Sequence, residues 1–66
     1  MLKNRLKSFR HKMEMNQKQF AEFLGVNYSL YNRWEKHDKE PNIESYWNIA
    51  KRIGCKIDDL IEEIPE

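Results

Sequence analysis

The fold is decided by residues 17–35, which read QKQFAEFLGVNYSLYNRWE. This stretch contains two short helical patterns joined at Gly25, with the small residue Ala21 where two such helices would cross. The apolar side chains that can face one common interior are Phe20, Leu24, Val26, Tyr31 and Trp34. The stretch therefore predicts two short helices packed on a shared core.

The second helix of this pair keeps an outward row of polar side chains that core packing does not require. Such side chains hydrogen-bond to base edges, and a second helix that carries them is typical of a helix-turn-helix, where it lies in the DNA major groove. The row predicts double-stranded DNA as the partner. The candidate base-reading residues are Asn27, Tyr28, Ser29, Asn32 and Arg33.

Capping signals predict where both helices begin and end. Asn16 is followed three residues later by Gln19, the arrangement of a capping box, and Asn27 is placed to cap the second helix. Gly25 can adopt the left-handed conformation that ends a helix. We expect helices over residues 17–24 and from Asn27 to about Lys36.

Three further helices are predicted around this pair, and no alternating pattern is long enough to indicate a strand. Apolar residues at helical spacing predict helices over residues 2–13, over 43–53 after the cap Asn42, and over 57–64. The predicted fold class is all-α, with five short helices in a single domain over residues 1–66.

Composition excludes several classes of protein. A hydrophobic fraction of 39% is too high for a disordered chain. No apolar run approaches the roughly 20 residues of a membrane span, so we expect no membrane partner. The single cysteine, Cys55, cannot form an internal disulfide, which favours a cytoplasmic, nucleoid-associated protein.

Charge is distributed unevenly along a chain whose net charge is only +1. Residues 1–37 carry eight Lys/Arg and three Asp/Glu, a net of +5, whereas residues 38–66 carry four and eight, a net of −4. The basic half contains the helical pair, so it would face phosphate and the acidic half would point away. The alternative is that the two halves simply attract each other within the fold.

Nothing in the sequence indicates catalysis. His11 and His37 have no Cys or carboxylate at metal-ligand spacing, no Gly-rich loop is present to hold phosphate, and Cys55 has no evident activating partner. We therefore expect no enzyme activity, no metal, no cofactor and no small-molecule ligand.

With the helices placed, residues 6–61 resemble the DNA-binding domain of the lambdoid phage repressor and Cro family, the Xre-like regulators. The matching pieces are Gln17, FAEFLGV at 20–26, NRWE at 32–35, EPN at 40–42, IAK at 49–51 and DDL at 58–60. The resemblance implies a lambda-repressor-like domain that acts as a small transcriptional regulator, a repressor of a phage or mobile element.

The resemblance also implies roles for residues beside the polar row. Gln17, with Asn16 beside it, would bind a DNA phosphate at a helix N-terminus, where anions are favoured. Arg10 and Glu35 match a structural ion pair that ties the first helix to the end of the third. Lysines near these positions would add attraction to phosphate that does not depend on base sequence, namely Lys18, Lys36 and Lys39.

Two positions depart from the family pattern. The loop after Glu35 usually contains a Gly, and His37 at the aligned position predicts a different turn. Tyr31 replaces a β-branched aliphatic residue, so its hydroxyl must find a partner or reach solvent when the ring is buried.

One such domain reads few base pairs, so we expect a homodimer on a palindromic operator with half-sites about 34–36 Å apart. The candidate dimer surface is Ile57, Leu60, Ile61 and Ile64, unless these residues complete the monomer core. The alternative function is a protein-interaction module on the same fold, an antitoxin or anti-repressor, and a regulatory protein partner is possible under either function.

Overall fold

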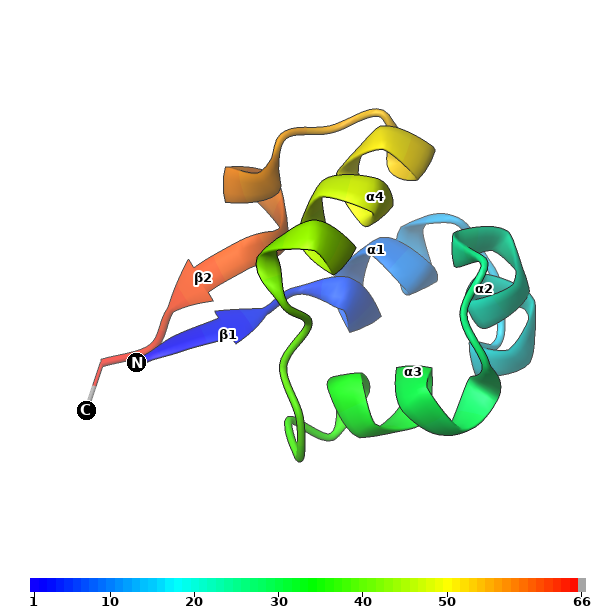
Figure 1. The fold of residues 1–66 in the computed structure, drawn as a ribbon, viewed down its shortest axis with the longest axis horizontal. Coiled ribbons are helices and arrows are strands. Elements are labelled where there is room, and N and C mark those ends of the chain that lie inside the picture. The colour runs from blue at the N-terminus through cyan, green and yellow to red at the C-terminus, as the bar shows by residue number, and fades with distance from the viewer. Residues whose placement is uncertain (66) are drawn as a thin grey trace.

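The two ends of the chain meet in a small antiparallel ribbon in the computed structural model of the protein, which describes residues 1–65 (Figure 1). Strand β1 (Leu2–Asn4) pairs with strand β2 (Ile61–Glu63), with Lys3 opposite Glu62. Backbone hydrogen bonds of 2.7 Å from Arg5 to Leu60 and 2.8 Å from Ile64 to Met1 continue the pairing on both sides. The ribbon therefore brackets the helical part of the chain.

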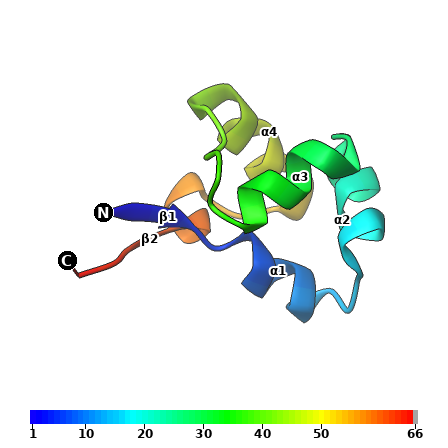
Figure 2. The same cartoon turned by 90° about the horizontal axis from the view of Figure 1, so that it is seen from below.

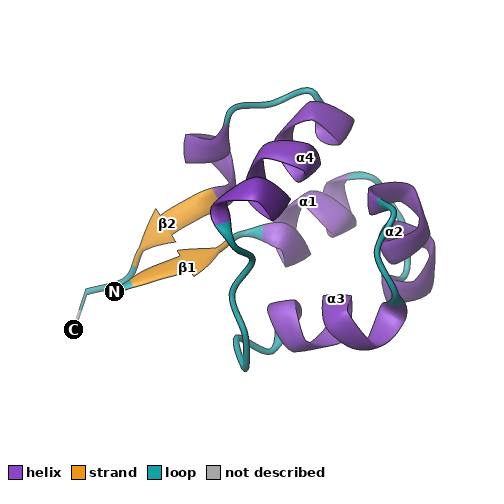
Figure 3. Cartoon of the chain, viewed as in Figure 1, coloured by secondary structure: helices purple, strands orange, loops and turns teal. Residues whose placement is uncertain are grey.

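Four α-helices and one 3-10 helix lie between these strands (Figure 3). They are α1 (Leu6–Lys12), α2 (Gln17–Leu24), α3 (Tyr28–Glu35), α4 (Ile43–Ile53) and η1 (Ile57–Leu60). Figure 1 shows α4 above, α3 below and α2 at the right-hand side, with the ribbon projecting from the opposite side.

The core lies where these helices meet and contains four of the five apolar side chains predicted for it, whereas Val26 is partly buried against it. Tyr31 and Phe20 are fully buried, with their rings 5.5 Å apart in an edge-to-face arrangement, and Trp34 is 2% exposed. Ala21 is 2% exposed, which fits its predicted place at the crossing of two helices. The other buried apolar residues are Leu6, Leu24, Tyr46, Ile49, Ala50 and Leu60.

The capping signals predicted from the sequence are present. Asn16 Oδ1 accepts a hydrogen bond of 2.8 Å from the Gln19 backbone N–H, and Gln19 Oε1 accepts one of 2.9 Å in return. Asn27 caps α3 and Asn42 caps α4 in the same way. The three helices that carry these caps have the bounds that the sequence predicts.

The prediction of five helices without strands is wrong at both ends of the chain. Residues 2–4 are a strand, and Leu2, expected in the apolar stripe of the first helix, is 65% exposed. The predicted helix over 57–64 is a 3-10 turn followed by β2, because Ile61 adopts extended backbone angles and pairs with Asn4. Pairing between the chain ends overrides weak helical periodicity here.

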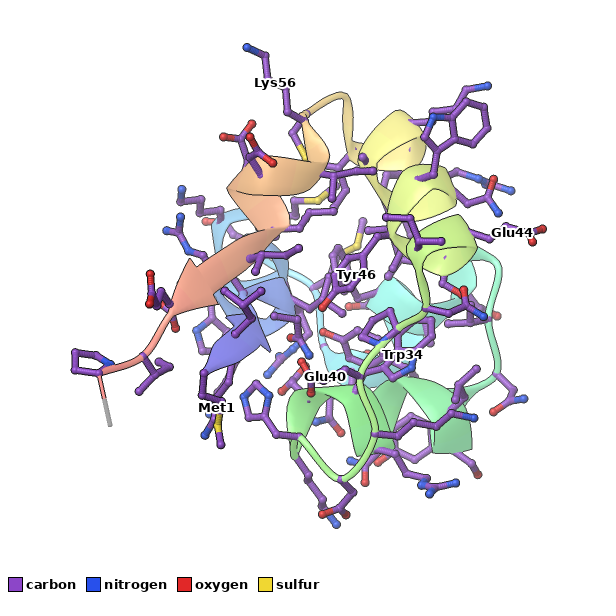
Figure 4. All side chains as sticks on the ribbon, turned by 60° about the vertical axis from the view of Figure 1, so that its left-hand side comes forward. Met1, Trp34, Glu40, Glu44, Tyr46 and Lys56 are labelled. Atoms are coloured by element: carbon purple, nitrogen blue, oxygen red, sulfur yellow. The ribbon has the colours of Figure 1, made fainter. Side chains whose placement is uncertain are left out.

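Asn4 ends strand β1 just before helix α1 begins. Its side chain is buried, and Oδ1 accepts a hydrogen bond of 3.1 Å from the Leu6 backbone N–H. Its Nδ2 donates to the Trp34 carbonyl at 2.9 Å and to Glu40 Oε1 at 3.1 Å. Figure 4 shows Trp34, Glu40 and Tyr46 gathered where α3, α4 and the ribbon meet. Asn4 thus joins the chain start to the end of α3.

The ends of α1, α2 and α3 share one arrangement, in which a left-handed residue follows the helix and two backbone bonds close it. After α3, His37 N–H donates to the Trp34 carbonyl and Asp38 N–H to the Arg33 carbonyl. After α1, Glu14 and Met15 donate to His11 and Arg10 in the same pattern. This is the Schellman arrangement that normally selects glycine.

His37 therefore corrects one sequence prediction. Its φ of 63° is left-handed, so the turn is one that glycine would also form, and not a different turn. His37 Nδ1 lies 3.2 Å from Glu40 Oε2 across this turn. The left-handed conformation costs a non-glycine residue such as His37 about 1–2 kcal/mol of stability. The same turn contains the two backbone hydrogen bonds and the contact with Glu40.

Glu14 provides a test of this strain, because its φ is 56° and its side chain is exposed. Glu14→Gly should raise the free energy of unfolding by about 0.5–1 kcal/mol, since relief of strain exceeds the entropy that glycine loses on folding. Thermal unfolding followed by circular dichroism measures this change as an increase in Tm.

The matched control is Gly54→Ala, where φ is +85° and an added Cβ would meet nothing within 4 Å. This substitution should lower stability by about 1–2 kcal/mol through backbone strain alone. If both substitutions changed the free energy of unfolding in the same direction, the result would contradict backbone strain at Glu14.

Candidate nucleic-acid interface

Helix α3 lies on an open side of the molecule. It forms the lower boundary in Figure 1 and lies nearest the viewer in Figure 2, with no other element in front of it. Its inner face buries Tyr31 and Trp34, and its outer face carries exposed Tyr28, Ser29 and Arg33. The structure thus brings the predicted base-reading residues together on one accessible surface, which we call the α3 face: Asn27, Tyr28, Ser29, Asn32 and Arg33.

These side chains differ in how free their polar groups are. The Arg33 guanidinium and the Ser29 hydroxyl are exposed and make no hydrogen bond with other described residues. Asn27 Oδ1 already accepts a bond of 2.7 Å from the Leu30 backbone N–H, so its side chain is held by the capping bond, with its amide donors still available. Asn32 and Tyr28 are both hydrogen-bonded to Gln17. Arg33 is therefore the least constrained donor on the α3 face.

Beneath the α3 face, Arg10 and Glu35 form a bidentate ion pair. Arg10 Nε donates to Glu35 Oε2 and Nη2 to Oε1, both at 2.9 Å, and the side chains are 13% and 5% exposed. Arg10 Nη1 also donates to the Met15 carbonyl at 3.2 Å. One guanidinium thus links α1, the connection to α2 and the last residue of α3.

Gln17 connects this ion pair to the α3 face. Its Nε2 donates to Glu35 Oε1 at 3.1 Å. Its Oε1 accepts from Asn32 Nδ2 at 3.0 Å and from the Tyr28 hydroxyl at 3.2 Å. The predicted phosphate ligand is therefore largely engaged within the protein, with one amide hydrogen of its side chain left for a ligand.

Tyr31 lies next to the same ion pair. Its hydroxyl is buried and has no hydrogen-bond partner of favourable geometry among the described residues, so the predicted partner or solvent contact is not found. Burial, together with the neighbouring Glu35 carboxylate, raises the pKa of Tyr31 far above its ordinary value. The hydroxyl therefore stays neutral beside the charged pair.

An open hollow lies where α2 begins, beside the first turn of α3. The capping geometry leaves the backbone N–H groups of Gln17 and Lys18 without a partner among the described residues, and the Lys18 ammonium is exposed. No carboxylate lines this hollow, whose lining residues are Arg10, Asn16, Gln17, Lys18 and Tyr28. At the other end of α3, Lys36 and Lys39 are exposed and form no ion pair with described residues.

The predicted dimer surface is divided by the fold. Leu60 is fully buried in the core, so it cannot contribute to a surface, whereas Ile57, Ile61 and Ile64 are half-buried. Exposed apolar residues lie near both parts of this surface, because Trp47, 53% exposed, lines a hollow with Ile57, and Met1 and Leu2 at the chain start are 64% and 65% exposed.

Residues 1–65 contain no group of three or more His, Cys, Asp or Glu placed to hold a metal ion. None of their helices is long and apolar enough to cross a membrane.

Comparison with known proteins agrees with this arrangement. A family model described as helix-turn-helix matches residues 6–60, which include α1 to η1. The chain belongs to the helix-turn-helix family of the Xre/Cro/C1 type.

Three relatives of this helix-turn-helix family are similar to the chain. It is 34% identical over 59 residues to an uncharacterized HTH-type transcriptional regulator of Methanocaldococcus jannaschii, covering 89% of each. It is 27% identical over 63 residues to the cryptic phage CTXphi transcriptional repressor of Vibrio cholerae, covering 96% of this chain and 57% of that protein. It is 28% identical over 58 residues to the repressor protein C2 of Salmonella phage P22, covering 88% and 27%. The chain therefore spans about half or less of the two phage repressors.

Sequence reasoning missed two residues that position the helix-turn-helix. Asn4 and Glu40 hold the end of α3 against the chain start. An Asn two residues before the first apolar residue of a helix is a local signal that could have identified Asn4. The Glu40 contact spans 36 positions and has no such local signal.

Removing one partner of the buried ion pair should destabilise the domain strongly. Arg10→Met strands the Glu35 carboxylate in a low-dielectric site and should cost about 3–5 kcal/mol. Arg10→Met/Glu35→Met replaces both charges with apolar groups and should recover most of that loss. Urea unfolding measures all three proteins, and a double variant no more stable than the single one would contradict this account of the pair.

Stability should also depend on pH through Glu35. Burial alone would raise the pKa of this carboxyl, but hydrogen bonds from Arg10 and Gln17 lower it below the ordinary value of 4.5. A depressed folded-state pKa contributes stability that is fully present above the unfolded-state pKa and is lost as pH falls through the folded-state pKa. We therefore expect stability to fall on acidification below about pH 4.5. The Arg10→Met/Glu35→Met variant should show a flatter acid limb, and an unchanged limb would contradict this role of Glu35.

Proposed function

We propose that the protein is a transcriptional repressor that binds a specific double-stranded DNA sequence with α3 in the major groove. The observation that carries this proposal is the α3 face, on which polar side chains stand exposed over a helix whose other side is buried. A helix needed only for packing would not require this row, and such rows read base edges in helix-turn-helix proteins. The similarity to two phage repressors supports repression as the direction of regulation.

In this proposal, phosphate contacts position α3 from both of its ends. Two free backbone N–H groups and the Lys18 ammonium at the start of α2 suit one phosphate, because a helix N-terminus favours anions. Lys36 and Lys39 suit phosphates near the other end of α3. Arg33 then reads the base sequence, since a guanidinium can donate two hydrogen bonds to the O6 and N7 atoms of guanine.

We also propose that two copies bind a two-fold symmetric operator. A single eight-residue α3 contacts few base pairs, and dimers of this class place their recognition helices about 34–36 Å apart. The ribbon supports a contact between copies, because exposed Met1 and Leu2 lie beside the half-buried Ile61 and Ile64. Burial of these side chains against a second copy would remove apolar surface from water.

Selection from a pool of random DNA duplexes tests the proposed function. Wild type should enrich a two-fold symmetric site, and Arg33→Ala should bind that site about 5- to 150-fold more weakly, as expected for the loss of a bidentate guanine contact. Lys36→Ala is the matched control on the same helix end, because a phosphate contact should weaken binding to every sequence alike and reduce the salt dependence.

Two results would contradict this proposal. An enriched site without two-fold symmetry would contradict the dimer. No enriched site at all, with only weak salt-sensitive binding to all duplexes, would contradict sequence-specific repression and favour the protein-interaction module, an antitoxin or anti-repressor.

A further inference from the structure

The Glu35 carboxylate fixes which way the Gln17 amide points. A carboxylate only accepts hydrogen bonds, and that of Glu35 is held charged by the Arg10 guanidinium at 2.9 Å. The atom of Gln17 that lies 3.1 Å from Glu35 Oε1 must therefore be the donor Nε2. The opposite orientation would set two oxygens against each other in a nearly buried site.

The orientation of Gln17 in turn fixes Asn32. Because Gln17 Oε1 only accepts, Asn32 must present Nδ2 to it, at 3.0 Å, and Tyr28 must donate its hydroxyl hydrogen, at 3.2 Å. Asn32 Oδ1 then points away from Gln17 and makes no hydrogen bond with a described residue. Within residues 1–65 the buried side-chain atoms that lack a partner are in Tyr31 and Trp34, so Oδ1 of the half-buried Asn32 reaches solvent.

We propose that Asn32 reads the amino group of a base, adenine N6 or cytosine N4, and that Gln17 is the positioning residue that sets this preference. This inference rests on the proposed DNA binding of α3. In the major groove adenine and cytosine offer a donor, whereas guanine and thymine offer acceptors. One Nδ2 hydrogen of Asn32 also stays free, so the fixed amide offers the acceptor Oδ1 with a donor beside it, which fits adenine N6 and N7 or cytosine N4. A keto base in the same place would set its oxygen against Oδ1. A free Asn could rotate its amide and bind either class.

The preference is measured at the base pair that Asn32 contacts. Asn32→Ala identifies that pair in the enriched site, because only there should base preference disappear. Wild type should favour A·T and C·G over the inverted pairs T·A and G·C by about 5- to 150-fold, the range for a base contact that is made or left unpaired. Gln17→Met keeps the side-chain length but frees the Asn32 amide, so this preference should fall towards unity while the position read by Arg33, which does not contact Gln17, stays as in wild type.

Lys18→Met is the matched control beside Gln17 on α2. It should weaken binding to all duplexes without changing any base preference, and thermal unfolding should show that all three variants remain folded. A Gln17→Met variant with the wild-type preference at this base pair, or a wild-type preference for a keto base there, would overturn the inference alone. A wild-type pool with no enriched site would overturn the proposed function and this inference with it.

Discussion

The ion pair between Arg10 and Glu35 is the constraint on which the arrangement of the α3 face depends. It lies almost out of water and closes α1 against the last residue of α3 with two hydrogen bonds of 2.9 Å. Because the charge on Glu35 also holds Gln17, the pair controls how α2 meets α3. The Glu35 carboxylate at the end of α3 contacts both α1 and α2, so the contacts that hold the three helices together also orient amides on the α3 face. A hydrophobic replacement could preserve the fold, but it could not orient Gln17.

The backbone turns that end the helices also help to place α1, α2 and α3 relative to one another in a chain with a small core. A domain of this size buries only about 60% of its unfolded surface, so the relative placement of short helices depends strongly on their ends. Helices α1, α2 and α3 all end in the same left-handed turn, although only α2 has glycine there. At His37 the turn leads directly to Glu40, which binds Asn4 and brings the ribbon to the end of α3.

Local signals made α2, α3 and α4 predictable from the sequence. Asn16, Asn27 and Asn42 each cap a helix through the N–H three residues later, and Gly25 and Gly54 end two of them. The ribbon was not predictable, because it pairs three-residue strands at opposite ends of the chain. The α3 face could be assigned from its polar row. The hydrogen bond between Asn32 and Gln17 could not be predicted from the sequence, because it depends on how two helices are placed and on the charge of Glu35.

The most direct test follows the side-chain amide protons of Gln17 and Asn32 by NMR hydrogen exchange in the free protein. Asn48 on α4 serves as an internal reference, because its amide is exposed and has no hydrogen bond with described residues. If the hydrogen bonds that run from Glu35 through Gln17 to Asn32 fix these side chains in the free protein, one amide proton of Gln17 and one of Asn32 should exchange more slowly than those of Asn48. Equal exchange at all three side chains would contradict this central claim.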